Sequence, residues 1–272
     1  MLRLIGLMLL IGSVISGCEK HKPSGLKQVA SRYVKNSVGM EFTMVRGGTF
    51  QMGSAKSPLA SPVHNVTLDS FEMSVTEVTN EQFELFMKRT RGEESSLGNG
   101  PVTGLTRKDV LRFAAWLSKK DEYTYLLPTE AQWEYAARGG LEGKDYPWGN
   151  EIDDTKALFE GKQAVAVKTY PPNEYGLFDM CGNVREMCWG EVEEYRVEAR
   201  INPRGPLALD FYASRGSGIC TPLQPWIWHS GIEVEVPGPG LGFRLVRIQD
   251  KLISKEISDA LKVAWNAISA MP

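Results

Sequence analysis

The sequence has almost no charge imbalance and no low-complexity segment or internal repeat. Its 31 lysines and arginines are offset by 33 aspartates and glutamates, which gives a formal net charge of −2. This balance leaves no basic footprint for nucleic acid, so we expect no nucleic-acid partner. With 272 residues, of which 42% are hydrophobic, the chain can bury one large core or two small ones.

Long hydrophobic runs are also scarce, and the one at the N-terminus is too short to span a bilayer as a stable helix. Arg3 precedes an apolar run from Leu4 to Ile15, and small residues follow. This pattern is typical of a signal peptide. The ending Ile15-Ser16-Gly17-Cys18 resembles the bacterial lipobox, in which the cysteine is acylated and becomes the new N-terminus. An ordinary signal peptide with a chance cysteine is the alternative.

The lipobox predicts how the N-terminal part is organised. Residues 1–17 are expected to be a lipoprotein signal peptide, and residues 18–35 the lipidated Cys18 and a polar tether. Acyl chains on Cys18 would hold the mature protein on a membrane without a transmembrane helix. We therefore expect a lipid-anchored protein of the bacterial cell envelope, at the outer membrane or cell surface.

Cysteine is rare, with four in the whole chain. If Cys18 is acylated, Cys181, Cys188 and Cys220 remain, and an odd number leaves one thiol free or in an intermolecular bond. Cys181 and Cys188 could pair in an oxidising compartment. The interpretation we favour is that both are small buried apolar residues.

Periodicity and turn signals predict a mixture of strands and helices. Alternation around Gly47-Gly48 predicts a hairpin over Val38 to Met52, and a second alternating run predicts a strand over Val63 to Phe71. Strand starts are also expected at 213–218 and 240–247. Tyr146 to Glu151 and similar proline-containing segments after Gly140 cannot be helix interiors.

Three helices have N-cap threonines, which are Thr79, Thr106 and Thr129. Thr79 and Thr129 are each followed by a glutamine three residues later, which is the capping-box pattern. Apolar residues at helical spacing follow Thr106. The helix after Thr129 is expected over Glu130 to Arg138 and should end at Gly139-Gly140.

The stretch from Tyr175 to Trp189 carries two carboxylates in an apolar and aromatic setting. Asp179 and Glu186 flank a Cys181-Gly182-Asn183 turn, and carboxylates in such a setting need a partner. Calcium takes six to eight oxygens, which two carboxylates and the turn carbonyls could supply together. In the alternative, the two carboxylates cap the turn or bond to its backbone amides.

Several motifs together resemble the formylglycine-generating enzyme, or sulfatase-modifying factor, superfamily. In chain order they are FQMGS at 50–54, EVTNEQF at 77–83, LPTEAQWEYAARGG at 127–140, YPWGNE at 146–151, YGLFDMCGNVREM at 175–187, SRG at 214–216 and GFRLVR at 242–247. The resemblance implies one α+β domain of the C-type-lectin-like type over residues 36–248, rich in irregular structure. An amphipathic pattern over residues 249–272 predicts a C-terminal helix beyond it.

The same resemblance implies sites that this chain keeps or lacks. One family calcium site falls on Asp179, Gly182, Val184 and Glu186, so we expect one structural calcium at most. The family's oxidases hold copper on two thiolates five residues apart, and copper(I) favours such soft ligands. Here Cys220 is about one residue out of register, and Pro225 stands five residues further on. We therefore predict no catalytic residues of that kind.

Some exported lipoproteins of the superfamily display a binding surface that retroelements diversify. The corresponding segment here, 218–239, departs from the family pattern between flanks that are kept. We expect it to bind a protein or other surface ligand. The residues expected to contact that ligand are Ile219, Cys220, Thr221, Leu223, Gln224, Trp226, Trp228, His229, Glu233 and Glu235.

Other interpretations of this segment stay open. Exposed together, Trp226 and Trp228 would form a rigid aromatic binding surface; in the alternative, they belong to the core of a diverged family member. The main alternative function is a formylglycine-generating-type oxidase or accessory maturation factor that uses Cys220. A structural envelope component that docks through the C-terminal helix is a third possibility.

Overall fold

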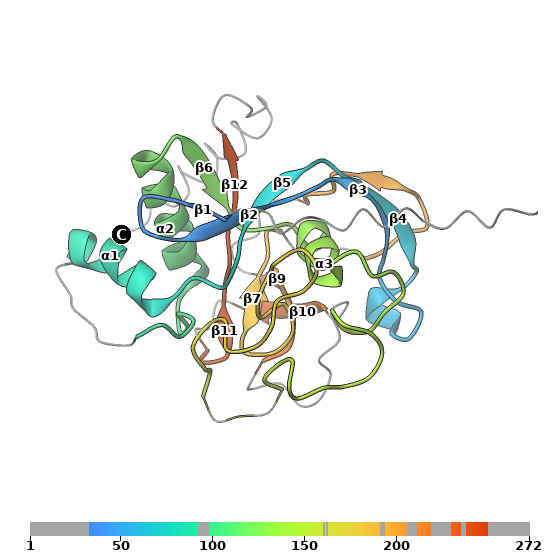
Figure 1. Ribbon diagram of the computed structural model, residues 1–272. Helices are drawn as coiled ribbons and strands as arrows, with labels where there is room; N and C mark the ends of the chain where they lie inside the picture. Colours follow the sequence, from blue (N-terminus) through green and yellow to red (C-terminus); the bar gives the residue numbers. More distant parts are fainter. Residues whose placement is uncertain are drawn as a thin grey trace, which may run out of the picture.

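A long β-ribbon that bends between residues 45 and 48 forms the first part of the domain in this computed structural model (Figure 1). The structure describes residues 33–91, 98–159, 161, 163–190, 194–205, 211–218, 230–234 and 238–249. One side of the ribbon consists of β2 (Glu41–Val45) and β3 (Gly48–Met52), and the other of β4 (His64–Leu68) and β5 (Phe71–Ser74). β2 pairs antiparallel with β5, and β3 pairs antiparallel with β4.

The expected hairpin over residues 38–52 is wrong, because β2 and β3 continue in one direction and lie in different sheets. Gly47 is the reason. A Cβ at this position would lie 2.4 Å from the carbonyl oxygen of Leu68, so the two sides of the ribbon can cross in close contact only at a glycine. The same bend divides the expected strand over residues 63–71 into β4 and β5.

Three sheets organise the described residues. A five-stranded sheet has the order β1-β2-β5-β12-β6, a four-stranded sheet the order β10-β9-β7-β11, and a three-stranded sheet the order β3-β4-β8. The remaining strands are β1 (Val34–Lys35), β6 (Tyr123–Leu126), β7 (Arg185–Met187), β8 (Arg200–Ile201), β9 (Phe211–Arg215), β10 (Ser230–Val234), β11 (Leu241–Gly242) and β12 (Val246–Gln249), with a 3-10 turn at Pro58–Ala60.

All three expected helices are confirmed, as α1 (Asn80–Arg91), α2 (Arg107–Lys120) and α3 (Glu130–Arg138). Thr79 and Gln82 form the reciprocal capping bonds, as do Thr129 and its glutamine. α3 ends at Gly139, which adopts the left-handed conformation with φ of 55°. In Figure 1, α2 lies beside β6 and α1 lies on the outer side of α2, whereas α3 lies near β7 and β9.

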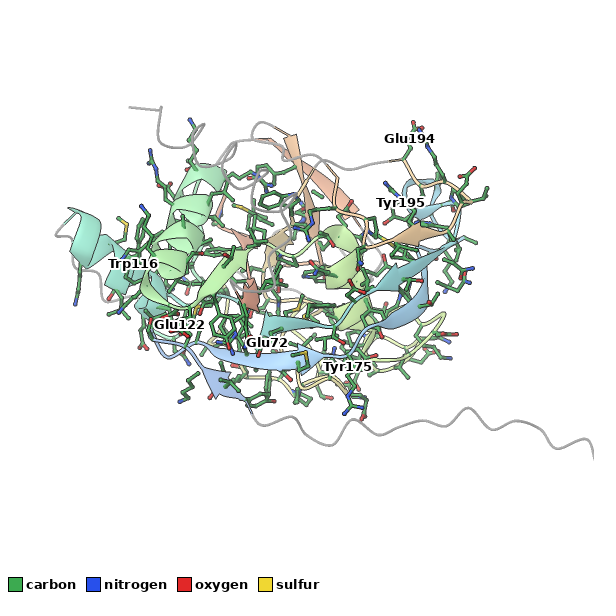
Figure 2. All side chains as sticks on the ribbon, turned by 90° about the horizontal axis from the view of Figure 1, so that it is seen from above. Glu72, Trp116, Glu122, Tyr175, Glu194 and Tyr195 are labelled. Atoms are coloured by element: carbon green, nitrogen blue, oxygen red, sulfur yellow. The ribbon has the colours of Figure 1, made fainter. Side chains whose placement is uncertain are left out.

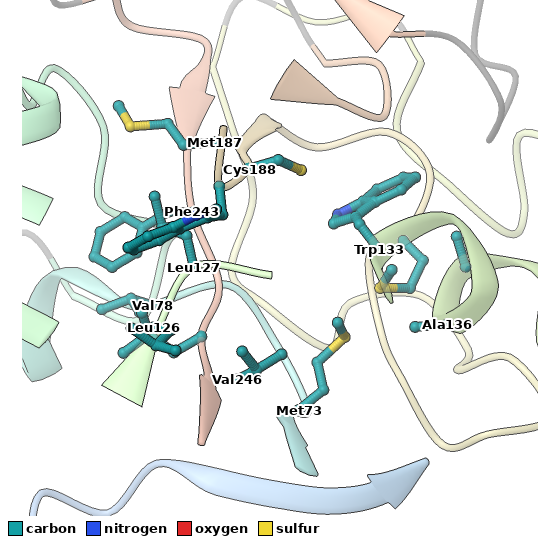
Figure 3. Packing of buried hydrophobic residues seen from close by; sticks show 14 of the residues in the cluster. Met73, Val78, Leu126, Leu127, Trp133, Ala136, Met187, Cys188, Phe243 and Val246 are labelled. Atoms are coloured by element: carbon teal, nitrogen blue, oxygen red, sulfur yellow. The ribbon is translucent and has the colours of Figure 1, made fainter. Parts of the chain in front are cut away.

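One hydrophobic core connects these elements. Its buried residues come from the five-stranded sheet, from α2 and α3, and from the strands of the four-stranded sheet. Figure 3 shows part of this packing, with Met73, Trp133, Phe243 and Val246 around a common centre. Within the described residues there is no helix long and apolar enough to cross a membrane. The predicted signal peptide, Cys18 and most of the tether lie outside the described residues, as does the predicted C-terminal helix from residue 250 on.

Candidate functional site

Glu186, in β7, lies at the centre of a fully buried polar network. It is 0% exposed, and its two carboxylate oxygens accept hydrogen bonds from Nε and Nη2 of Arg244, both at 2.7 Å. Oε2 also accepts a 2.7 Å bond from the indole nitrogen of Trp133. Arg244 further donates to the carbonyl of Phe178 at 2.9 Å. The network therefore joins β7, α3 and the segment before β12.

Two more carboxyl groups, those of Asp179 and Glu77, lie near the ion pair of Glu186 and Arg244. Asp179 accepts a 3.0 Å bond from the backbone N–H of Lys168, which lies outside the turn named in the capping alternative. Glu77 accepts from the side-chain amide of Asn183 at 3.1 Å. Burial first, and then the neighbouring carboxylates Asp179 and Glu186, raise the pKa of Glu77 well above its ordinary value. Burial also raises the pKa of Asp179. One guanidinium thus faces three carboxyl groups, and the raised pKa values favour the neutral form of Glu77, which reduces the negative charge of the cluster.

The predicted calcium ligands fit this arrangement unevenly. A cation would favour the ionised forms of Glu77 and Asp179, and Gly182 lies in a turn with φ of 89°. The Glu186 oxygens, however, are already bonded to Arg244 and Trp133, so an ion would have to share them. No group of three or more acidic, histidine or cysteine side chains in the described part of the chain has a metal-binding arrangement. Calcium at Asp179, Gly182, Val184 and Glu186 stays a prediction.

A second buried network supports β9. Glu134, in α3, is 0% exposed and pairs with Arg138 at 2.6 Å and with Arg215 at 2.9 Å. Arg215 also donates to Glu130 at 2.8 Å and to the hydroxyl of Tyr195, labelled in Figure 2, at 2.5 Å. Burial alone would raise the pKa of Glu134, but the two guanidiniums outweigh it and hold the pKa below its ordinary value.

Sequence reasoning missed this second network. The four-residue spacing of Glu134 and Arg138 on an expected helix was a signal for their ion pair. The contact with Arg215 joins residues 81 positions apart, and no local pattern indicates it.

The two cysteines in the described part of the chain, Cys181 and Cys188, are buried. Cys181 and Cys188 form no disulfide, which confirms the interpretation that both are small buried residues. Burial raises the pKa of both thiols, so neither favours the thiolate form that binds copper. Cys220 lies outside the described residues.

The structure describes the two strands that flank the expected ligand surface. β9 leads into it and pairs antiparallel with β10, with Glu233 in register with Tyr212. Glu233 is the one expected ligand-contacting residue within a described strand. The others, at positions 219–229 and at 235, lie outside the described residues, so their roles stay predictions.

The mixed α and β architecture, with its short strands and long irregular segments, is that of the C-type-lectin-like fold, as expected. Over residues 28–249 the sequence matches the sulfatase-modifying factor enzyme 1-like domain. The chain belongs to this family, which confirms the superfamily that the motifs indicated.

Relatives from several classes share this domain. A protein named serine/threonine-protein kinase pkn1 from Chlamydia pneumoniae is 33% identical over 226 residues, which cover 69% of this chain and 36% of that protein. The chain therefore spans about a third of that relative's length. The formylglycine-generating enzyme of Mus musculus is 27% identical over 250 residues, with 65% of each chain covered.

Among solved structures, Treponema denticola variable protein 1 superposes with a TM-score of 0.69. It is 22% identical, and the match covers 79% of this chain and 97% of that one. At this identity the likeness shows the fold alone.

Proposed function

We propose that this protein is a lipid-anchored binding protein of the bacterial envelope that performs no formylglycine-type oxidation. Acyl chains on Cys18 hold it on the membrane, and the surface formed by residues 218–239 binds a protein or other surface ligand. We also propose that the protein binds one structural calcium near Asp179.

The chemistry of the thiols carries this proposal. Copper(I) bound between two cysteines needs two accessible thiolates, and the position five residues after Cys220 is Pro225. Neither Cys181, 3% exposed, nor Cys188, 0% exposed, can replace the missing ligand. The chain thus has the scaffold of the family without a second sulfur for its oxidase chemistry.

The buried networks support a binding surface. Glu186 and Arg215 stand in register on β7 and β9, and each is bonded to α3, through Trp133 or through Glu134. Because both strands are anchored to the same helix, the segment between β9 and β10 starts from a rigid base. A rigid base lowers the entropy lost when a loop binds its ligand.

The test compares wild-type protein with Cys220→Ser. Each is loaded with copper(I) and incubated with a cysteine-containing sulfatase peptide, and aldehyde is measured by mass spectrometry. We expect no aldehyde from either protein, with the family's active enzyme as positive control. Aldehyde that forms with wild type and disappears with Cys220→Ser would refute the proposal. That result would establish the oxidase alternative, which we consider because the chain belongs to this family.

A second test addresses diversification and needs no protein. The coding region for residues 213–247 and the DNA that follows it are sequenced from independent isolates. Differences clustered at adenine-containing codons, with a near-copy and a reverse transcriptase gene nearby, would identify a diversified receptor. A constant segment would refute diversification and point to a fixed ligand.

A further inference from the structure

Arg107 is a buried arginine with an unused hydrogen-bonding edge. It is the first residue of α2 and is 0% exposed. Nη1 donates to the carbonyl oxygen of Cys188 at 2.8 Å, and the guanidinium carbon lies 4.6 Å from the centre of the Tyr212 ring. These two contacts fix the plane of the group. Nε and Nη2 are buried and have no hydrogen-bond partner.

The two unused donors lie on the same edge of the guanidinium. Two other arginines show what this edge binds. Arg244 directs Nε and Nη2 to the two oxygens of Glu186, and Arg247 directs the same two atoms to the two oxygens of Glu72 at 3.1 Å each. Such paired bonds match the geometry of a carboxylate or phosphate. In Arg107 the equivalent fork is oriented and empty of any protein acceptor.

Arg107 also differs from the buried arginines Arg215 and Arg244 in the side chains that influence its pKa. Carboxylates help to raise the pKa of Arg215 and of Arg244 above the ordinary value. Burial lowers the pKa of Arg107 to about 10, and among the described residues the titratable side chains that raise it are those of Tyr212 and Cys188. The group is still protonated at neutral pH. A buried cation without an anion is costly, and each unsatisfied donor costs about 1–3 kcal/mol.

The position of Arg107 connects it to the expected ligand surface. Tyr212 belongs to β9, the strand that leads into that surface, and Ser214 on the same strand accepts a hydrogen bond from Arg185. In β10, Gly231 is in register with Ser214. Arg107 also stands in the first turn of α2, where the helix dipole favours negative charge.

We propose that Arg107 binds an oxyanion group of the ligand, a carboxylate, phosphate or sulfate, through Nε and Nη2. This inference rests on the proposed ligand surface and adds the chemistry of what that surface binds. The ligand is then an acidic molecule whose charged group is drawn out of water against α2 and β9. Enclosure strengthens the charge pairing, because less solvent screens it.

The experiment uses inorganic anions and the full chain. The melting temperatures of wild type, Arg107→Met, Arg107→Lys and the exposed control Arg46→Gln are measured with sodium phosphate, sulfate or acetate replacing chloride at constant ionic strength. We expect wild type and Arg46→Gln to show a saturable rise of several degrees. Arg107→Lys should show a weaker rise, because it keeps the charge but loses the fork, and Arg107→Met should show none.

The melting temperatures measured in chloride, without these anions, separate an effect of the substitution on folding from an effect on anion binding. Replacing an unpaired buried cation with an apolar side chain of similar length should leave the melting temperature unchanged or raised. If Arg107→Met folds and responds to anions as wild type does, the inference is refuted. A wild type that responds to none of the three anions also refutes it. If Arg107→Met does not fold, the comparison of Arg107→Lys with Arg46→Gln decides.

The three anions distinguish the sources of the charged group. A response to acetate alone indicates a carboxylate, and a response to phosphate and sulfate indicates a tetrahedral oxyanion. None of these measurements depends on the aldehyde assay. An anion response together with aldehyde formation would therefore refute the binding-only function while retaining Arg107 as an anion-binding residue.

Discussion

Replacing Glu186 with glutamine should destabilise the domain more than any surface charge change. The substitution keeps the shape of the side chain but removes the charge that Arg244 pairs with. Both residues are 0% exposed, so the guanidinium cannot recover its partner by turning to solvent. Breaking a buried pair from one side typically costs about 3–5 kcal/mol.

The other carboxyl groups around Arg244 place the expected loss of unfolding free energy near the lower end of that range. Glu77 and Asp179 also act on Arg244, so some of the lost attraction is retained. For a domain of this size, about 3 kcal/mol corresponds to a fall of about 6–12 °C in melting temperature. The loss should appear in the denaturant midpoint without a change in slope.

Urea unfolding followed by tryptophan fluorescence measures this effect, with Glu72→Gln as the matched control. Glu72 (Figure 2) accepts the same two-atom fork from Arg247, but its side chain is 17% exposed, so the control should lose less. In a double-mutant cycle with Arg244→Met, the double variant should lose less than the sum of the single variants. A loss below about 1 kcal/mol, or additive losses, would refute the role assigned to Glu186.

Three further predictions concern acid stability, calcium and the anchor. The folded pKa of Glu134 lies below its unfolded value. The ion pairs of Glu134 therefore contribute their full stabilisation above the unfolded pKa of about 4.3, and this stabilisation is lost as the pH falls through the folded pKa. Glu134→Gln should therefore flatten the acid limb of a stability profile, and an unchanged limb contradicts this. Calcium added to chelator-treated protein should raise the melting temperature, and Asp179→Ala should abolish the rise; no rise in wild type excludes the site. Cys18→Ser should lose incorporation of a labelled fatty acid and leave the membrane fraction, and continued labelling would exclude Cys18 as the lipidated residue.

Local sequence determined much of the fold. The capping threonines fixed where the three helices begin, because a side-chain oxygen satisfies amides that have no partner within the helix. Gly139 fixed where α3 ends. The motifs between Phe50 and Arg247 identified the family, and the burial of Cys181 and Cys188 followed from their apolar surroundings.

Only the tertiary structure decided which residues pair across the chain. Gly47 looked like a hairpin turn, and its role as a bend depends on contact with Leu68, far away in sequence. The partner of Glu186 is Arg244, 58 residues away, and the missing partner of Arg107 becomes visible only when every neighbour is placed. Hydrogen bonds and ion pairs of this kind depend on the distances between atoms in the folded chain. Residue types and spacing indicated that the carboxylates needed partners, and the packing of α3 against β7 and β9 determined which partners they have.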